Sequence, residues 1–239
     1  MKENFRQAWL IVVRELRIDR YYLLASLLFI LYMAVFAGLM ISALDREPRF
    51  SLLADLLFWL AVSGIGYYFS KRIFKYITQD SYTHMLAYYR TLPIPPQALA
   101  LARILQMVMS FIVNGIVFFG LMYTLYGELR QLLGIGAYIG FALTWTGLAL
   151  LTNALYIVME CLMKGKAYFW YSFVLMIGVT AIMLILRLTG IHPLEESIRT
   201  SARLGMASPV MWLLLAAGIA SAYWAYRTIV RRLPKRNLA

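Results

Sequence analysis

The feature that most constrains the fold of this chain is the length of its uncharged sequence. No Asp, Glu, Lys or Arg occurs between Ile104 and Gly127. A helix needs ~20 residues at ~1.5 Å per residue to cross the ~30 Å hydrocarbon layer of a bilayer, and this run is long enough. The whole chain is 62% hydrophobic and 14% charged, whereas soluble domains carry roughly 25% charged residues. The sequence therefore excludes a water-soluble fold.

Charged residues divide the chain into six apolar stretches, so the predicted fold class is all-α, a polytopic membrane protein with six transmembrane helices in a single transmembrane domain, 1–239. The second stretch is the weakest because it contains Asp55. This carboxylate lies one turn after the predicted start, where it would face the interface and the positive end of the helix dipole. We expect a structural role for it rather than a role in an ion pathway. The predicted spans are 21–44, 52–70, 104–126, 133–159, 167–186 and 210–226.

Basic residues are distributed unevenly between the two sides of this arrangement. Six spans place both termini on one side, and that side holds all but six of the 23 lysines and arginines. Loops rich in Lys and Arg remain in the cytoplasm, so we predict a multi-pass protein of the cell membrane with both termini cytoplasmic. This asymmetry and the attraction of basic loops to anionic lipid explain the pI of about 9.9, and no nucleic-acid partner is needed.

The N-terminal segment, 1–20, has the pattern of an amphipathic helix lying at the membrane surface. Its apolar side chains recur at helical spacing, whereas its arginines and Glu15 are assigned to the opposite, polar face. A segment that only fixes topology by its positive charge is the alternative. The side chains expected at the membrane interface are Phe5, Trp9, Val12 and Leu16.

A second short helix, 79–92, is predicted in the longest cytoplasmic loop. Asp80 and Ser81 suit its start, Pro93 prevents its continuation, and Pro96 suits the start of the next helix, which runs through Arg103 into the third span. A helix fixed between two spans is an element on which a soluble partner can push; resting on lipid is the alternative. Either its apolar stripe or the face of His84, Ala87 and Tyr88 would meet the partner. The candidate contact residues are Tyr82, His84, Met85, Tyr88, Tyr89 and Arg90.

On the opposite side, 189–209 is predicted to contain a short amphipathic helix lying at the outer surface. Glu195 and Glu196 occupy the first turn, where the helix dipole favours acidic residues, and Arg199 follows Glu195 at i+4. A plain connector between the last two spans is the alternative.

The spans contain few polar residues, and none of the six contains Lys, Arg or Glu. Asn114 and Asn153 are the conspicuous exceptions to their apolar character. Buried asparagines most often bond to neighbouring helices and sometimes contact cargo. Gly136 and Gly140 form a G-x-x-x-G pattern, which favours close helix packing. The candidate residues for helix packing or a cargo path are therefore Asn114, Asn153, Gly136 and Gly140.

The chain has few residues suited to catalysis, metal binding or nucleotide binding. The chain has no G-x-x-x-x-G-K-[ST] phosphate loop, one cysteine, and two histidines, His84 and His192, predicted on opposite sides of the membrane. We therefore expect no enzymatic activity, no metal and no cofactor in this chain. Any ATP and Mg²⁺ would be bound by a partner.

Together these features resemble the membrane subunit of a type 2 ATP-binding cassette (ABC) exporter. The segment Tyr89-Arg90-Thr91-Leu92-Pro93-Ile94, followed by Ala102-Arg103, is similar to the family's "L-x-S-L-P-I/V … R" pattern before the third span. The resemblance implies an elbow helix at 1–20 and a coupling helix at 79–92. It also implies a permease that pairs with an identical or different permease over separate cytoplasmic ATPase subunits.

The expected function is ATP-driven export of an amphipathic or hydrophobic cargo, such as a peptide, a lipid-like molecule or a drug. This cargo class follows from the absence of fixed ionic sites in the predicted spans. A non-transporting membrane protein, for immunity or assembly, is the alternative, and copurification of an ATPase distinguishes the two.

Overall fold

The computed structural model describes residues 2–44, 51–73 and 75–236, and all regular elements among them are helices. Five are long and apolar enough to cross a membrane. The all-α prediction is thus confirmed, and five of the six predicted spans coincide with helices that could cross a membrane, which supports a multi-pass membrane protein. The five helices are α2 (Arg20–Leu44), α6 (Pro96–Leu125), α8 (Ile135–Leu162), α9 (Gly165–Leu188) and α11 (Pro209–Arg232).

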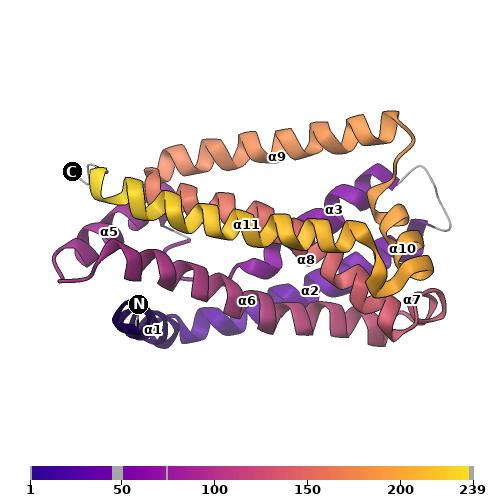
Figure 1. Ribbon diagram of the computed structural model, residues 1–239, viewed down its shortest axis with the longest axis horizontal. Helices are drawn as coiled ribbons and strands as arrows, with labels where there is room; N and C mark the ends of the chain where they lie inside the picture. The colour runs from indigo at the N-terminus through magenta and orange to yellow at the C-terminus, as the bar shows by residue number, and fades with distance from the viewer. Residues whose placement is uncertain (1, 45–50, 74, 237–239) are drawn as a thin grey trace.

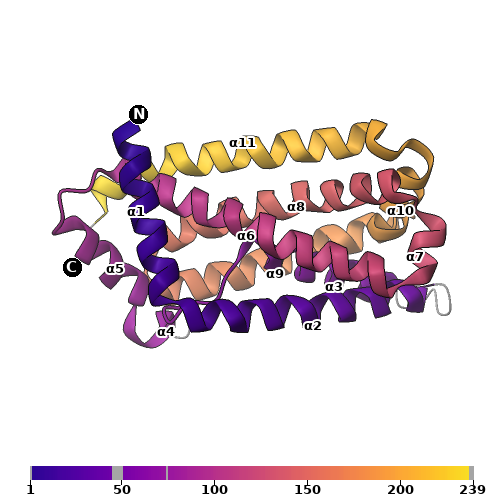
Figure 2. The ribbon, with the colours of Figure 1, turned by 90° about the horizontal axis from the view of Figure 1, so that it is seen from below.

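The second predicted span, 52–70, is wrong as a continuous helix. Helix α3 (Ser51–Ser63) gives way to the short 3₁₀ turn η2 (Gly64–Gly66), and Tyr67 is already extended. Glycine is a poor helix former, by ~1 kcal/mol relative to alanine, and two glycines follow Ser63 within three residues. Residues 67–70, which form neither helix nor strand, lead from η2 toward the end of the bundle where α4 lies (Figure 2).

Apart from α3 and η2, the short helices gather at the two ends of the bundle (Figure 1). One end holds both termini, α1 (Lys2–Ile18), α4 (Tyr76–Gln79), α5 (Ser81–Arg90) and η4 (Leu233–Lys235). The other end holds α7 (Gly127–Leu132), α10 (Pro193–Leu204) and η3 (Gly205–Ala207). The termini and the helix at 79–92 thus lie at one end and the helix within 189–209 at the other, as the sequence predicts. Which end is cytoplasmic stays a prediction.

Cysteine labelling tests that orientation. His84 on α5 and Glu195 on α10 are both exposed, whereas Cys161 is buried. In a Cys161→Ser background, we expect a membrane-impermeant maleimide to label Glu195→Cys in intact cells and to label His84→Cys only after the membrane is opened. Labelling of His84→Cys alone in intact cells would show that the chain has the opposite orientation in the membrane.

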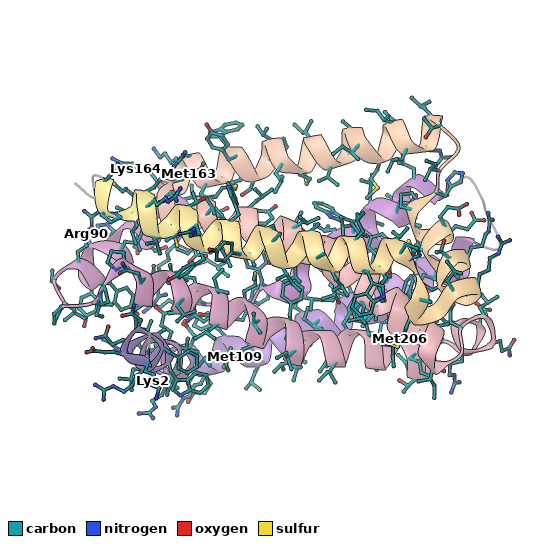
Figure 3. The ribbon with its side chains drawn as sticks, in the orientation of Figure 1. Lys2, Arg90, Met109, Met163, Lys164 and Met206 are labelled. Atoms are coloured by element: carbon teal, nitrogen blue, oxygen red, sulfur yellow. The ribbon has the colours of Figure 1, made fainter. Side chains whose placement is uncertain are left out.

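Helix α8 runs through the middle of the bundle, and side chains fill the space between it and α6 and α11 (Figure 3). Close packing on α11 requires Gly147, where an added Cβ would lie 2.6 Å from the Leu214 carbonyl carbon. In the G-x-x-x-G pattern, Gly140 packs similarly, since its Cβ would lie 2.8 Å from the carbonyl oxygen of Gly205. Gly136 has open space around it, so only one of the two glycines packs against another part of the chain.

Candidate functional site

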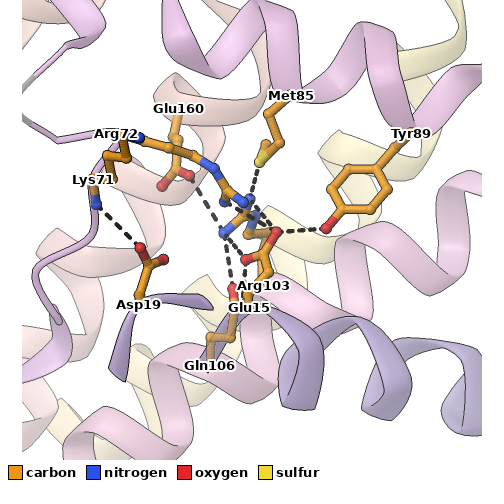
Figure 4. Close-up of polar contacts among 9 residues, drawn as sticks. All are labelled: Glu15, Asp19, Lys71, Arg72, Met85, Tyr89, Arg103, Gln106 and Glu160. Atoms are coloured by element: carbon orange, nitrogen blue, oxygen red, sulfur yellow. Dashed lines mark hydrogen bonds and ion pairs between the residues drawn. The ribbon is translucent and has the colours of Figure 1, made fainter. Parts of the chain in front are cut away.

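A cluster of buried charges lies beneath α5, and Glu15 of α1 is at its centre (Figure 4). The Glu15 side chain is 0% exposed. Its Oε1 lies 3.0 Å from Nη1 of Arg72 and accepts a 2.7 Å hydrogen bond from the Tyr89 hydroxyl. Its Oε2 lies 3.1 Å from Nη1 of Arg103 and accepts a 2.7 Å bond from Nε2 of Gln106. Both carboxylate oxygens are therefore fully engaged.

Arg103 connects this carboxylate to the rest of the bundle. It lies on the second turn of α6, its Nη1 donates to Oε1 of Gln106 at 2.9 Å, and it stands 3.7 Å from Oε1 of Glu160 on α8. Its other terminal nitrogen contacts the sulfur of Met85 on α5. The cluster therefore joins α1, α5, α6, α8 and the segment after η2, which carries Arg72.

The charges of the cluster are balanced, because Glu15 and Glu160 face Arg72 and Arg103. Burial by itself raises the pKa of Glu15, but the guanidiniums of Arg103 and Arg72 and the hydrogen bonds from Tyr89 and Gln106 outweigh it and lower that pKa to about 2. Burial, together with the Glu15 carboxylate and its hydrogen bond, raises the pKa of Tyr89 to about 12. Glu15 is thus an anion and Tyr89 a neutral donor throughout the physiological range.

Both ends of α5 are also tied to other elements. At its start, Asp80 has a left-handed backbone (φ 43°), and its Oδ1 accepts a 2.8 Å bond from the amide of Gly165, the first residue of α9. At its end, Arg90 donates to the carbonyl oxygens of Leu233, at 2.5 Å, and Pro234.

A third tie to α5 comes from the C-terminal segment. Arg236 donates to the Thr83 hydroxyl at 2.6 Å and to the carbonyls of Cys161 and Met163, each at 2.8 Å. A displacement of α5 would therefore disturb α9, the end of α8 and the C-terminal segment together.

Burial separates the two predicted contact faces of α5. Tyr82, Met85 and Tyr89 are buried against the bundle, so in this conformation they hold α5 in place and are inaccessible to a partner. His84 is exposed, and Tyr88 is 47% exposed. Tyr88 also accepts a 3.0 Å bond from Arg14 of α1. Arg90 is exposed, but its guanidinium binds the C-terminal segment.

The predicted interface residues of α1 fall into two groups. Phe5 and Trp9 are 51% and 44% exposed, as a helix lying at a membrane surface requires. Val12 is 0% exposed, and Leu16 packs against the core. The assignment of Val12 to the interface is therefore wrong, because α1 packs this side on α6. The assignment of Glu15 to the polar face is wrong for the same reason. Leu16 is only partly buried, and its place at the interface stays a prediction.

Asn114 and Asn153 lie at the point where α3 breaks. The side-chain amide of Asn114 donates to the carbonyls of Ile65 and Tyr67, both at 2.9 Å, and that of Asn153 donates to the carbonyl of Ser63 at 2.9 Å. A broken helix leaves carbonyls without partners, which is costly in an apolar interior. The two asparagines, from α6 and α8, satisfy these carbonyls, and no contact with cargo is needed to explain them.

Asp55 has a comparable role at the opposite end of the bundle. It is 2% exposed, and its Oδ1 accepts a 2.8 Å hydrogen bond from the amide of Leu194 in the first turn of α10. A carboxylate there satisfies a free amide and complements the helix dipole. The first turn of α10 is thus anchored to α3, in line with the structural role expected for Asp55.

The bundle and its buried cluster define the class of this molecule: a polytopic helical membrane protein with balanced charges buried at the end that holds both termini. Comparison of the chain with known protein families, with curated proteins and with solved structures found no match.

Proposed function

We propose that this chain is the membrane subunit of an ABC exporter, and that α5 receives force from a separate cytoplasmic ATPase. The observation that carries the proposal is the burial of one side of α5 on the Glu15–Arg103 cluster. The alternative predicted for α5, an apolar face resting on lipid, does not account for buried arginines and glutamates beneath it. A helix bonded at both ends and along one side transmits displacement instead of absorbing it.

The route of that force follows from the contacts. Pressure on the outer face, at His84 and Tyr88, moves Met85 and Tyr89, which contact Arg103 and Glu15. Arg103 belongs to α6 and Glu15 to α1, so both helices move with α5. Paired buried charges keep a few discrete arrangements, because an unpaired intermediate is costly. The cluster therefore favours switching between states over gradual deformation.

In this proposal, ATP and Mg²⁺ are bound by the ATPase, and a second permease, identical or different, completes the transporter. The cargo is amphipathic or hydrophobic. Phe5 and Trp9 hold α1 at the cytoplasmic leaflet, where its exposed arginines meet anionic phosphates.

Substitutions on the exposed face of α5 test this proposal. The double variant His84→Ala, Tyr88→Ala removes the exposed side chains and leaves the buried cluster intact. If these residues meet the ATPase, copurification of the ATPase should fall by about tenfold or more, because a few central aromatic side chains dominate most interfaces. Tyr223→Ala, at an exposed tyrosine of α11, is the matched control.

Full ATPase retention and transport by the double variant, with the same yield of folded protein, would contradict this site. Failure of any ATPase to copurify with the wild-type chain would favour the alternative, a non-transporting membrane protein for immunity or assembly.

A further inference from the structure

A cavity of about 380 Å³ lies beside the break in α3. Side chains of α2, α3, α8 and α9 line it, together with Tyr67, Phe69, Ile73, Tyr76 and Tyr82. The volume lies within the ~300–1,000 Å³ typical of pockets for small molecules.

The chemistry of the lining restricts what can occupy this cavity. Among the described residues, no charged side chain lines it. A neighbouring cavity of about 50 Å³, which shares Tyr67, Ile73 and Tyr82 with it, is lined by Arg72, Arg103 and Glu160. These tyrosines thus stand between the charged cluster and the larger cavity. Moving an ion into such surroundings without a partner is strongly unfavourable. The occupant must therefore be uncharged.

Aromatic rings surround the space and point to a ring-bearing occupant. Tyr67 and Tyr156 meet edge to face with centroids 5.5 Å apart, and Tyr168 contacts Tyr76 and Tyr82 at 5.1 and 5.6 Å. Phe29 and Phe69 form another part of the lining. Planar rings gain ~0.5–1.5 kcal/mol per aromatic contact beyond the burial of area, a gain that an acyl chain does not obtain.

The Tyr67 hydroxyl gives the cavity a polar point. It is buried beside Tyr168 and makes no hydrogen bond of good geometry. A buried hydroxyl whose neighbour, Tyr168, is poorly aligned keeps part of the ~1–3 kcal/mol that an unsatisfied donor costs. A carbonyl or hydroxyl oxygen on the occupant would remove that cost by accepting from Tyr67.

Tyr168 and Ser172, near the start of α9, form part of the lining. Most of this helix is exposed, and it stands apart from the bundle over much of its length (Figure 1). We propose that the cavity binds an uncharged, ring-bearing molecule with an oxygen acceptor, which enters from the bilayer. The site requires neither an ATPase nor transport, so it stands apart from the exporter proposal.

Photolabelling with benzophenone, an uncharged diaryl ketone, tests the site in lipid nanodiscs. On irradiation, the ketone carbon bonds to a nearby side-chain carbon, whose hydrogen passes to the ketone oxygen. We expect saturable labelling of peptides containing Met33, which lines the cavity. The anionic analogue 4-benzoylbenzoate should label them about tenfold less, a difference of ~1.4 kcal/mol.

Two variants make the test specific. Gly64→Leu fills the cavity, and its Cβ is tolerated because the nearest atom outside its own backbone surroundings, Cε1 of Phe29, lies 3.6 Å away. It should lower Met33 labelling about tenfold, or ~1.4 kcal/mol, whereas Gly120→Leu, in open space on α6, should not. Tyr67→Phe keeps the ring and removes the hydroxyl, so it should raise the benzophenone concentration at which labelling saturates, without altering the fold.

Unchanged saturable labelling in both Gly64→Leu and Tyr67→Phe, or labelling spread evenly over the exposed side chains of α9, would overturn the proposal. Saturable labelling of Met33 in detergent but not in nanodiscs would also overturn it, by showing that a lipid tail fills the cavity.

Discussion

Replacing Glu15 by alanine is expected to destabilise the protein more than any other single substitution at the cluster. The change leaves Arg103, whose side chain is 7% exposed, buried beside the single carboxylate of Glu160 at 3.7 Å. Removing one partner of a buried ion pair typically costs ~3–5 kcal/mol, because the remaining charge is uncompensated. For a chain of this size, that cost lowers the midpoint of thermal unfolding by about 10 °C.

The measurement is the temperature at which detergent-purified protein loses its monodisperse peak in size-exclusion chromatography. Glu3→Ala, an exposed acid on the same helix, is the control and should leave the midpoint unchanged. The double variant Glu15→Leu, Arg103→Met removes both charges. It should be less destabilised than the sum of its single variants, because apolar pairs replace buried ion pairs at little cost. Additive losses would mean that lost packing, and not charge, explains the effect.

The pH dependence follows from the lowered pKa of Glu15, about 2 against an ordinary value of 4.5. A depressed folded-state pKa gives stability that is complete above the unfolded value and is lost as pH falls through the folded value. The difference in midpoint between wild type and Glu15→Gln should therefore be constant from pH 8 to about pH 5, and should shrink from there toward pH 2.

The sequence predicts the frame of this molecule well, because long apolar runs leave few alternatives in lipid. Helix α6 begins at Pro96, as its fixed φ and the prolines before it indicate. Hydropathy alone does not predict the break in α3, because an apolar run has the same hydropathy whether its helix is continuous or broken. Gly64 and Gly66 indicate a break in the helix, and the two asparagines are polar enough to replace its lost hydrogen bonds. That these asparagines lie beside the break becomes evident only in the folded bundle.

The sequence pattern does not predict the buried cluster, for two separate reasons. It assigns Glu15 to the polar face of α1, although Glu15 follows Ala8 by seven residues and Ile11 by four, which places it on the side that is buried. Arg103 and Glu160 lie one residue outside the predicted spans 104–126 and 133–159, so the limits of the apolar runs exclude them. Helices α6 and α8 continue past those limits. Charged residues at the edges of apolar runs therefore belong among the candidates for buried pairs.

The second large effect is expected at Gly66, the last residue of η2, which packs against both α6 and α8. A Cβ there would lie 2.5 Å from Cγ of Asn153 and 2.7 Å from Cε2 of Phe111, both closer than carbon atoms approach. Gly66→Ala must therefore displace the Asn153 side chain, which donates to the carbonyl of Ser63. Overpacking costs ~1–3 kcal/mol, and an unpartnered buried carbonyl costs a similar amount. Together they lower the unfolding midpoint by about 10 °C.

The control is Gly115→Ala on α6, whose Cβ would make an ordinary 3.7 Å contact with Ile65. It should be neutral or slightly stabilising, since alanine favours a helix more than glycine does.

The double variant Gly66→Ala, Asn153→Ala separates the two costs, because it relieves the overlap with the amide but still leaves the Ser63 carbonyl without the hydrogen bond from Asn153. If Gly66→Ala alone proves as stable as Gly115→Ala, the chain tolerates movement here, and the asparagines do not fix the break in α3. A loss that the second substitution only partly restores would mean that the hydrogen bonds of Asn153, as well as the tight packing, hold the broken helix in place.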